Sequence, residues 1–231
     1  MSIKHLFFDL DRTLWDFDKN SFEELNFLYK KYKLHEKGIS LPNEFIKVYK
    51  EVNEKCWEQY RLDLLSKEDL REKRFYDTLS YFGIENKKLS IQFGDDYVQN
   101  SPFRTCLIPG TIDLLEKLQP YYKMHIITNG FDEVQHIKLS NSNLSKYFQV
   151  VVTSEMAGAK KPSPLAFEYA LDKANANANE SVMIGDDLNT DIKGAINVGM
   201  KTIYFNPHSV KHTYPIWKEV ALLNEINSIL L

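Results

Sequence analysis

Short apolar runs recur along the chain, and each is bounded by polar residues and turn signals. They lie at residues 3–9, 123–128, 148–154, 181–185 and 201–205. Their short lengths and their β-branched and aromatic residues are typical of strands that are buried on both faces. The pattern therefore predicts the strands of a parallel sheet.

Segments between these runs have apolar residues at helical spacing. Residues 111–119 and 163–174 each carry an apolar stripe. Residues 189–198 begin at Asn189, a good helix N-cap, and end before Gly199, a good residue to follow a helix. Strands that alternate with helices predict an α/β fold, with a Rossmann-like doubly wound parallel sheet and right-handed crossovers.

One interval breaks this alternation, because residues 16–98 contain no convincing strand. It has the pattern of successive amphipathic helices at residues 17–33, 42–60 and 66–83, the last of which ends at Gly83. A helical insert of this size after the first strand indicates a separate lid. The predicted domains are an α/β core at residues 1–15 and 99–231 and an all-α cap at residues 16–98.

Composition restricts the class of protein. The chain has 231 residues, 43% hydrophobic and 26% charged, which is typical of a globular protein with a sizeable core. The net charge of −3 gives no general electrostatic reason to bind nucleic acid or an anionic membrane. No apolar run has the length of a membrane span or the position of a signal peptide. Cys56 and Cys106 lack a CxxC pattern, so we expect free thiols and a cytoplasmic protein.

Acidic, hydroxyl and basic side chains follow four of the predicted strands. Because the carboxyl ends of parallel strands meet at one edge of a sheet, we expect these side chains to form one site. In chain order the groups are Asp9 and Asp11; Thr128, Asn129 and Gly130; Lys160 and Lys161; and Asp186, Asp187 and Asp191.

Carboxylates gathered in a partly dry site would repel one another, and a divalent cation removes that conflict. Mg²⁺ is the natural candidate for Asp9, Asp11 and Asp186, since it prefers oxygen ligands and keeps positions for water and phosphate. No cluster of histidine and cysteine suggests zinc. His208 and His212 are four residues apart but lie in a loop flanked by prolines, so we expect no metal role for them.

These residue types suit phosphoryl transfer. A carboxylate beside a cation and a lysine can attack phosphorus and form an aspartyl-phosphate. A second carboxyl two residues later can protonate the leaving oxygen and then take a proton from water, which requires its pKa to be raised relative to the first. Thr128 can donate a hydrogen bond to the phosphoryl oxygens, and a lysine can neutralise their charge.

Four segments together resemble the motifs of the haloacid dehalogenase-like (HAD) superfamily of phosphohydrolases. They are FDLDRTL, ITNG, KKPSP and MIGDDLNTD, and they occur in the family's order over essentially the whole chain. The resemblance implies a Mg²⁺-dependent phosphatase whose helical cap closes over the site and selects the substrate. Within the superfamily, FDLDRTLWDFDKN and SPFRTCLIPG look most like the house-cleaning pyrimidine 5′-nucleotidase branch.

The resemblance also implies roles for individual residues, with Asp9 as nucleophile and Asp11 as general acid and base. The implied catalytic residues are Asp9, Asp11, Thr128 and Lys161; the substrate contacts are Thr128, Asn129, Gly130 and Lys161; the metal ligands are Asp9, the main-chain carbonyl of Asp11, and Asp186, with Asp191 in support. Asp187 and Asp191 could instead serve the helix at residues 189–198 as acidic residues near its positive end. Arg12 departs from the family, in which glycine is common, and we expect its side chain to face solvent.

Several interpretations stay open at this point. The leading substrate is a nucleoside 5′-monophosphate among small phosphorylated metabolites, followed by a phosphosugar or phosphoglycolate. A phosphomutase, a 2-haloacid dehalogenase and a catalytically idle binding module are the alternatives, although a dehalogenase attacks carbon and has no need of Asp11. A monomer and a homodimer are both compatible with the chain, and no nucleic-acid or membrane partner is expected.

Aromatic and basic residues near the insert have two possible roles. They could stack a nucleobase and bind a ribose or phosphate, or they could pack inside the cap, and for each one singly we favour packing. The set is Trp15, Phe17, Phe22, Trp57, Tyr60 and Arg61.

Overall fold

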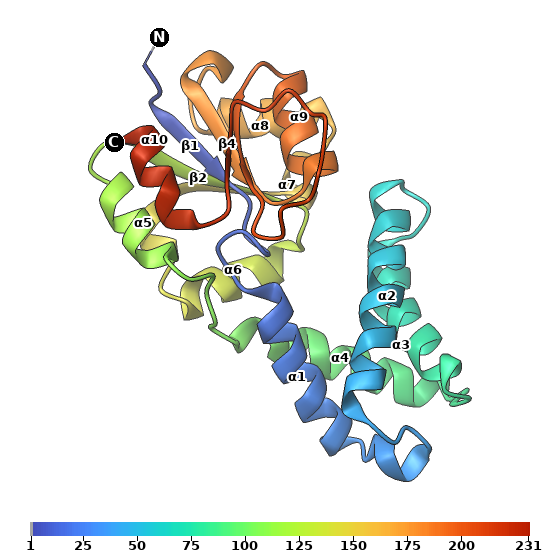
Figure 1. Cartoon of the computed structure of the whole chain (residues 1–231). Helices are drawn as coiled ribbons and strands as arrows, with labels where there is room; N and C mark the ends of the chain where they lie inside the picture. The colour runs from blue at the N-terminus through green and yellow to red at the C-terminus, as the bar shows by residue number, and fades with distance from the viewer. Residues whose placement is uncertain (1) are drawn as a thin grey trace. The chain divides into compact units, whose positions relative to one another are not determined.

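The computed structural model describes residues 2–231, which divide into two compact units. The core unit contains the N-terminal segment through Phe17 together with Thr105–Leu231, and the cap unit contains Asp18–Arg104. Figure 1 shows both units coloured along the chain. The sequence predicts boundaries after residues 15 and 98, whereas the contacts divide the chain after Phe17 and Arg104.

A six-stranded parallel sheet forms the centre of the core unit, in the order β3-β2-β1-β4-β5-β6 (Figure 1). Five strands coincide with the predicted apolar runs, and the predicted α/β fold class is confirmed. The sequence did not indicate β6, which is three residues long and buries only Val220. The strands are β1 (His5–Phe8), β2 (Lys123–Thr128), β3 (Phe148–Thr153), β4 (Ser181–Gly185), β5 (Lys201–Phe205) and β6 (Lys218–Val220).

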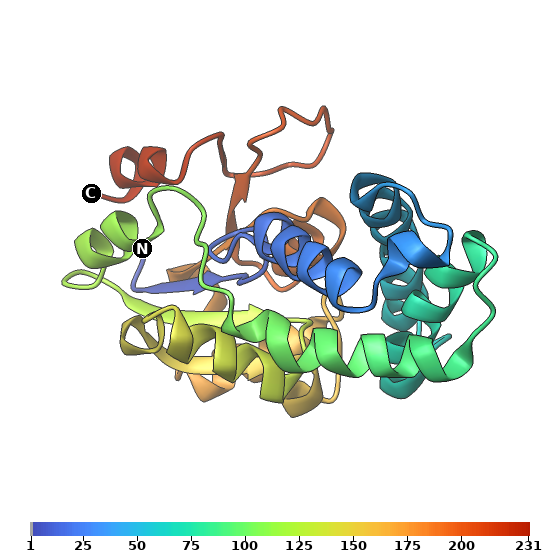
Figure 2. The ribbon, with the colours of Figure 1, turned by 90° about the horizontal axis from the view of Figure 1, so that it is seen from below.

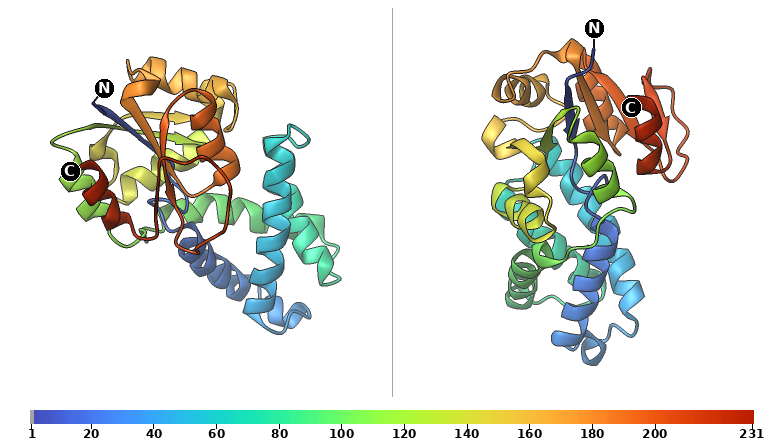
Figure 3. Two further views of the ribbon diagram at one scale, coloured as in Figure 1. Left: turned by 45° about the horizontal axis from the view of Figure 1, so that its top comes forward. Right: turned by 90° about the vertical axis from the view of Figure 1, so that its left-hand side faces the viewer.

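Helices cover both faces of the sheet, as Figures 1 and 3 both show. Side chains alternate along β1, so Leu6 and Phe8 enter one apolar cluster with α5, α6 and α10, whereas Phe7 enters another with α8 and α9. The strands β1, β2, β4 and β5 are buried along almost their whole length, as the apolar runs indicate. The helices of the core unit are α5 (Thr111–Leu118), α6 (Asp132–Asn141), α7 (Ser154–Ala157), α8 (Pro164–Lys173), α9 (Lys193–Asn197) and α10 (Asn227–Leu230).

The helix predicted at residues 189–198 has a different form. A π-helical turn spans Leu188–Ile192, and α9 follows it. The N-cap is Asp187 rather than Asn189, because the Asp187 carboxylate accepts hydrogen bonds from the main-chain N–H groups of Asn189 and Thr190, at 2.7 and 3.1 Å. The prediction of Asn189 as the cap is therefore wrong. The N–H groups of Asp191 and Ile192, which an Asn189 cap would bind, donate to the Asp187 carbonyl at 3.0 and 3.2 Å.

Four long helices make up the cap unit, and Figure 2 shows them in blue to green. Their apolar faces enclose an aromatic cluster, in which Phe45, Phe75 and Phe93 are fully buried. Helix α3 begins with the capping box of Ser66 and Asp69, which the pattern of residues in this segment favours. The helices are α1 (Phe17–Lys31), α2 (Pro42–Arg61), α3 (Lys67–Tyr81) and α4 (Lys87–Asn100).

Helix α4 has no counterpart among the three helices that the sequence predicts for the insert. It begins at the N-cap Asn86, whose side chain accepts a hydrogen bond from the N–H of Leu89 at 3.0 Å. Gly94 interrupts the apolar pattern in its middle and weakens the helical signal. The reason for the glycine is tertiary, because a Cβ there would lie 3.1 Å from the ring of Phe75.

Two further expectations can be compared with the structure. Neither Cys56 nor Cys106 is part of a disulfide in the described residues. Among residues 2–231, every helix is too short or too polar to span a bilayer.

Candidate active site

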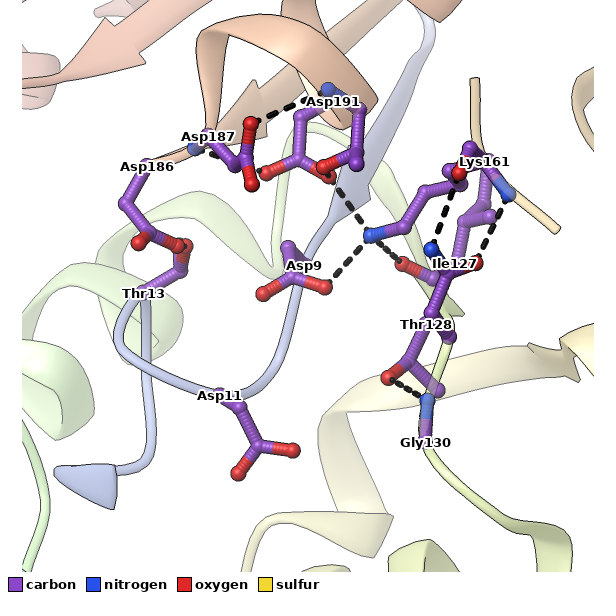
Figure 4. Close-up of polar contacts among 12 residues, drawn as sticks. Asp9, Asp11, Thr13, Ile127, Thr128, Gly130, Lys161, Asp186, Asp187 and Asp191 are labelled. Atoms are coloured by element: carbon purple, nitrogen blue, oxygen red, sulfur yellow. Dashed lines mark hydrogen bonds and ion pairs between the residues drawn. The ribbon is translucent and has the colours of Figure 1, made fainter. Parts of the chain in front are cut away.

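The carboxyl ends of the three central strands meet, as the doubly wound topology requires. Asp9 follows β1, Thr128 ends β2, and Asp186 follows β4, and these strands are neighbours in the sheet. Lys161 comes from the segment after α7 and reaches the same place (Figure 4). The structure thus brings together side chains from all four of the predicted strand ends.

Lys161 contacts both Asp9 and Asp191, and its side chain is almost completely buried. Its ammonium group donates to Asp9 Oδ1 at 2.5 Å and to the Ile127 carbonyl at 2.8 Å, and it lies 2.6 Å from Asp191 Oδ1. Asn129 fixes the lysine main chain, because its Oδ1 accepts from the Lys161 N–H at 2.7 Å and its Nδ2 donates to the Lys161 carbonyl at 3.0 Å. The Asn129 side chain therefore positions Lys161.

The electrostatics of the site follow from burial. Burial raises the pKa of Asp9 well above its ordinary value, although Lys161 opposes the shift. Burial, and then the charge of Asp191, raise the pKa of Asp186 to about 7. The pKa of Asp191 is raised by burial, again against the effect of Lys161. Burial alone would lower the pKa of Lys161, but Asp191 and Asp9 raise it above its ordinary value, so the lysine stays charged.

Three carboxylates form a group that fits a divalent cation. Asp9, Asp186 and Asp191 each offer an oxygen atom, and these atoms lie within 4.8 Å of one another. The donors are hard oxygens, and one lysine charge leaves two of the three negative charges unbalanced, which matches Mg²⁺. Both Asp191 oxygens already have partners, Lys161 on Oδ1 and the Asp187 N–H on Oδ2 at 3.2 Å, which suits the supporting role expected of it.

Two residues near the acidic cluster have structural roles that the sequence left open. The Thr13 hydroxyl, which is fully buried, donates to Asp186 Oδ1 at 2.9 Å and fixes that carboxylate. The DxDxT pattern contains this threonine, but no role was predicted for it. Asp187 is the N-cap described above, so its carboxylate is turned to the main chain of the π-helical turn.

Arg12 lies on the surface, as expected, and its main chain adopts a φ of 67°. This left-handed conformation is the physical reason for the glycine that is common at this position in the family. The guanidinium packs 4.8 Å from the centroid of the Phe17 ring, and its charge lowers the pKa of Asp186 against the larger effect of burial.

Thr128 and Gly130, both expected to contact the substrate, lie at the end of β2 and just after it. The Thr128 hydroxyl oxygen accepts from the Gly130 N–H at 3.0 Å and from Gln135 Nε2 at 2.8 Å, which leaves its own hydrogen free to be donated. Helix α6 begins at the N-cap Phe131, so Thr128 does not cap it.

Asp11 lies apart from the acidic cluster, and Figure 4 shows its carboxylate pointing away from Asp9. Two side chains of α6 bind it, Lys138 and Gln135. Neither residue is among those predicted from the sequence. Both follow the ITNG motif by less than ten residues, but nothing in their spacing alone points to Asp11.

The aromatic and basic residues near the insert are divided between the two units. Trp15 is buried in an apolar cluster of the core unit and Phe17 packs against it. In the cap unit, Tyr60 is buried and meets Trp57 edge to face, with ring centroids 5.5 Å apart, while Arg61 pairs with Glu54 at 3.0 Å. Phe22 is 42% exposed.

The two loop histidines are not part of the group of acidic residues described above. The ring of His212 lies 3.2 Å from Glu219 Oε2 and accepts a hydrogen bond from the Tyr214 N–H. His208 is exposed.

Known proteins resemble this chain over its whole length. The profile of the haloacid dehalogenase-like hydrolases matches residues 6–205. The pyrimidine 5′-nucleotidase YjjG of Escherichia coli K12 is 32% identical over 230 residues, which cover 97% of this chain and 96% of that protein. The pyrimidine 5′-nucleotidase PynA of Streptococcus pneumoniae R6 is 31% identical, with 100% and 98% covered. A crystal structure of the HAD-hydrolase YfnB from Bacillus subtilis, bound to magnesium, is 27% identical with a TM-score of 0.90, and 100% and 99% of the two chains are covered.

The parallel sheet, the acidic cluster with its lysine and these similarities define the class of protein. The chain belongs to the haloacid dehalogenase-like hydrolase family, which confirms the resemblance of its four motifs. More particularly, it is a phosphatase of that family.

Proposed function

We propose that this phosphatase is a Mg²⁺-dependent phosphomonoesterase that forms an aspartyl-phosphate at Asp9 and acts on a nucleoside 5′-monophosphate. The observation that carries the proposal is the buried ion pair of Asp9 with Lys161 inside the cluster of three carboxylates. The choice of substrate is supported by the full-length similarity to two pyrimidine 5′-nucleotidases. The cap unit is the helical insert that such phosphatases use to select substrates.

In the first half-reaction, a carboxylate oxygen of Asp9 attacks phosphorus, and the bond from phosphorus to the ester oxygen breaks. The alcohol oxygen leaves with a proton from the carboxyl of Asp11, so that a neutral nucleoside departs. Lys161 holds Asp9 at Oδ1 and fixes the direction of the carboxylate. The free hydrogen of Thr128 and the main-chain N–H groups beside it can donate to the phosphoryl oxygens.

In the second half-reaction, water attacks the phosphorus of the aspartyl-phosphate. Asp11, now ionised, takes the proton of this water, and the bond from phosphorus to the Asp9 oxygen breaks. Inorganic phosphate leaves and Asp9 is restored. The ion pair with Lys138 stabilises the charged carboxylate that this step uses.

The cation would be held by Asp9 and Asp186, with Asp191 in support and the Asp11 carbonyl as a predicted further ligand. When bound, Mg²⁺ supplies positive charge that offsets the carboxylates and the phosphoryl oxygens. Thr13 keeps the Asp186 carboxylate in place through its hydroxyl. Lys161 and Asn129 hold the remaining side of the cluster in one arrangement.

The test is a phosphate-release screen with the full chain. Nucleoside 5′-monophosphates, sugar phosphates, phosphoglycolate and an aryl phosphate are compared with and without Mg²⁺, and kcat/KM is measured for each. We expect Mg²⁺-dependent turnover with the highest kcat/KM for a nucleoside monophosphate. A higher value for a sugar phosphate or phosphoglycolate would move the substrate to that class and leave the mechanism intact.

Other outcomes separate the remaining interpretations. Retention of the phosphoryl group on a sugar phosphate, with no inorganic phosphate in a single turnover, would indicate a phosphomutase. Halide release from a 2-haloacid would indicate a dehalogenase. Absence of turnover with every phosphomonoester in the presence of Mg²⁺ would contradict the proposal and favour an idle binding module.

A further inference from the structure

Helix α6 presents two side chains to Asp11 from one of its faces. Gln135 and Lys138 are three residues apart, so they lie side by side on the helix surface. Lys138 Nζ is 2.6 Å from Asp11 Oδ1 and 2.9 Å from Oδ2, and Gln135 Nε2 is 2.9 Å from Oδ2. Both carboxylate oxygens of Asp11 are therefore held by α6.

Burial makes this arrangement more than a surface ion pair. Lys138 is 5% exposed and Gln135 is fully buried, and the Lys138 ammonium lies 4.3 Å from the centroid of the Trp15 ring. A buried lysine is costly unless a carboxylate and hydrogen bonds compensate it. Asp11 is the only carboxylate that pairs with Lys138 among residues 2–231.

The amide of Gln135 is arranged in a way that favours Asp11. Its Nε2 donates to Asp11 Oδ2 and to the Thr128 hydroxyl, whereas its buried Oε1 has no partner among the described residues. An unpartnered buried oxygen is unfavourable, so the orientation is set by the two acceptors that need the NH2 group. Gly130 makes room for it, because a Cβ at this position would lie 1.9 Å from Gln135 Nε2.

We propose that Lys138 and Gln135 are positioning residues that hold the Asp11 carboxyl in the single orientation from which it exchanges protons with the leaving group and with water. The inference rests on the role of Asp11 in the proposed function. Asp11 stands in the loop after β1 with its side chain 26% exposed, so without these contacts it would populate several rotamers. Gln135 also binds Thr128, and α6 thereby links the proton-transfer group to the phosphate-binding side chain.

The test uses the dependence of kcat/KM on the leaving group, because general-acid help matters most for a poor leaving group. The variant K138M is compared with wild type on a nucleoside or alkyl phosphate and on nitrophenyl phosphate. We expect kcat/KM to fall by roughly 10- to 100-fold for the alkyl ester and by less than about 5-fold for the aryl ester. Q135L should show the same pattern more weakly, and K138R, which keeps the charge, should recover part of the loss.

Two controls separate positioning from a general loss of structure. K146M removes an exposed lysine that lies over the Tyr147 ring in the same unit, and it should leave both substrates unaffected. In the background of D11N, adding K138M should cause no further loss of kcat/KM for either ester, since Lys138 acts through Asp11. A purely structural defect would instead lower both esters equally and add to the effect of D11N.

The outcomes distinguish this inference from the proposed function. If wild type releases no phosphate from any ester, the proposed function fails and the inference falls with it. If wild type is active and K138M keeps the wild-type ratio of alkyl to aryl kcat/KM, the inference alone is overturned. Additive losses in the double variant would overturn it as well.

Discussion

Asp9 is the residue on which the proposed chemistry depends most directly. We expect D9N to lower turnover of any phosphomonoester by at least about 10³-fold, because an amide cannot form the acyl-phosphate. The fold should persist, since Lys161 keeps its contact with Asp191 and the substitution removes a buried charge. Phosphate release and circular dichroism measure the two effects. The control D113N changes an exposed carboxylate of α5 and should keep full activity; turnover by D9N near that of D113N would refute the nucleophile assignment.

Gly185, the last residue of β4, is the second position at which a single substitution should have a large effect. A Cβ there would lie 2.3 Å from Asp191 Oδ2, so G185A must displace this carboxylate. We expect the free energy of unfolding to fall by about 1–3 kcal/mol, as for other overpacked sites. Turnover should fall with it because Lys161 loses a fixed partner. Chemical denaturation and phosphate release test the two effects. Wild-type values of both would show that the contact is easily relieved.

The sequence could predict part of the site at this scale and not the rest. Asp9, Thr128 and Asp186 stand at or directly after strand ends, so strand prediction alone brings them together, whereas Lys161 reaches the site from the segment after α7. Lys138 could not be predicted to meet Asp11, because the two are 127 residues apart and a lysine in a helix is usually solvated. The contact between Lys138 and Asp11 can be recognised only when the positions of the end of β1 and of α6 are known.

At the scale of elements, β1 and β2 carry an unusual pair of buried histidines. His5 and His125 stack with ring centroids 5.3 Å apart, and His5 Nδ1 lies 3.0 Å from His125 Nε2. Burial, followed by the charges of His5 and Lys123, lowers the pKa of His125 to about 4. The pair is therefore neutral in the folded protein at neutral pH.

The contribution of His125 to stability should consequently fall in acid. The unfolded chain binds a proton at the ordinary histidine pKa, whereas folded His125 resists it until about pH 4, so stability is complete above about pH 6.5 and is lost as the pH falls between these values. The loss from His125 is at most about 3 kcal/mol. Between about pH 6.5 and 4 we therefore expect the free energy of unfolding, measured by denaturant titration at each pH, to change less favourably in wild type than in H125L, by up to this amount.

The comparison between variants is necessary because three carboxyl groups act in the opposite direction. The raised pKa values of Asp9, Asp186 and Asp191 make the folded protein bind protons more readily than the unfolded chain, which adds stability as the pH falls. H136Q, at an exposed histidine of α6, serves as the matched control and should keep the wild-type slope. An equal slope in H125L and wild type would contradict a role for the histidine pair.

Elements differ in how well the sequence predicts them, and the reasons are physical. The first five strands are apolar because helices cover both of their faces, so their signal is strong. Strand β6 lies at the edge of the sheet and buries one side chain, so it lacks that signal. Helix α4 is not predicted, because Gly94 lowers the helix propensity of the segment. Close packing against Phe75, which leaves little room for a side chain, is the reason for the glycine. The π-helical turn after β4 depends on the Asp187 cap, which competes with Asn189.

The whole molecule contains two units with hydrophobic cores of their own. The apolar clusters around the sheet belong to the core unit, and the aromatic cluster around Phe45 and Phe75 belongs to the cap unit. The proposed metal ligands all belong to the core unit. A ligand that binds only the folded state stabilises the unit that contains its site.

Calorimetry should therefore distinguish the units. At a Mg²⁺ concentration 100 times Kd, binding contributes about 2.7 kcal/mol, which raises the unfolding temperature of the core unit by about 5 °C or more. We expect this shift in wild type and its loss in D186N or with a chelator. An equal shift in D186N would contradict the proposed site, and D113N is again the matched control.

The order of strands has a consequence for how the chain reaches its structure. β1 is the earliest strand in the chain but occupies the middle of the sheet, between β2 and β4, which begin at Lys123 and Ser181. During synthesis, the apolar segment HLFF stays without either neighbour until most of the protein has left the ribosome, while the cap helices make their local contacts first. The burial of β1 therefore waits for strands that are synthesised much later.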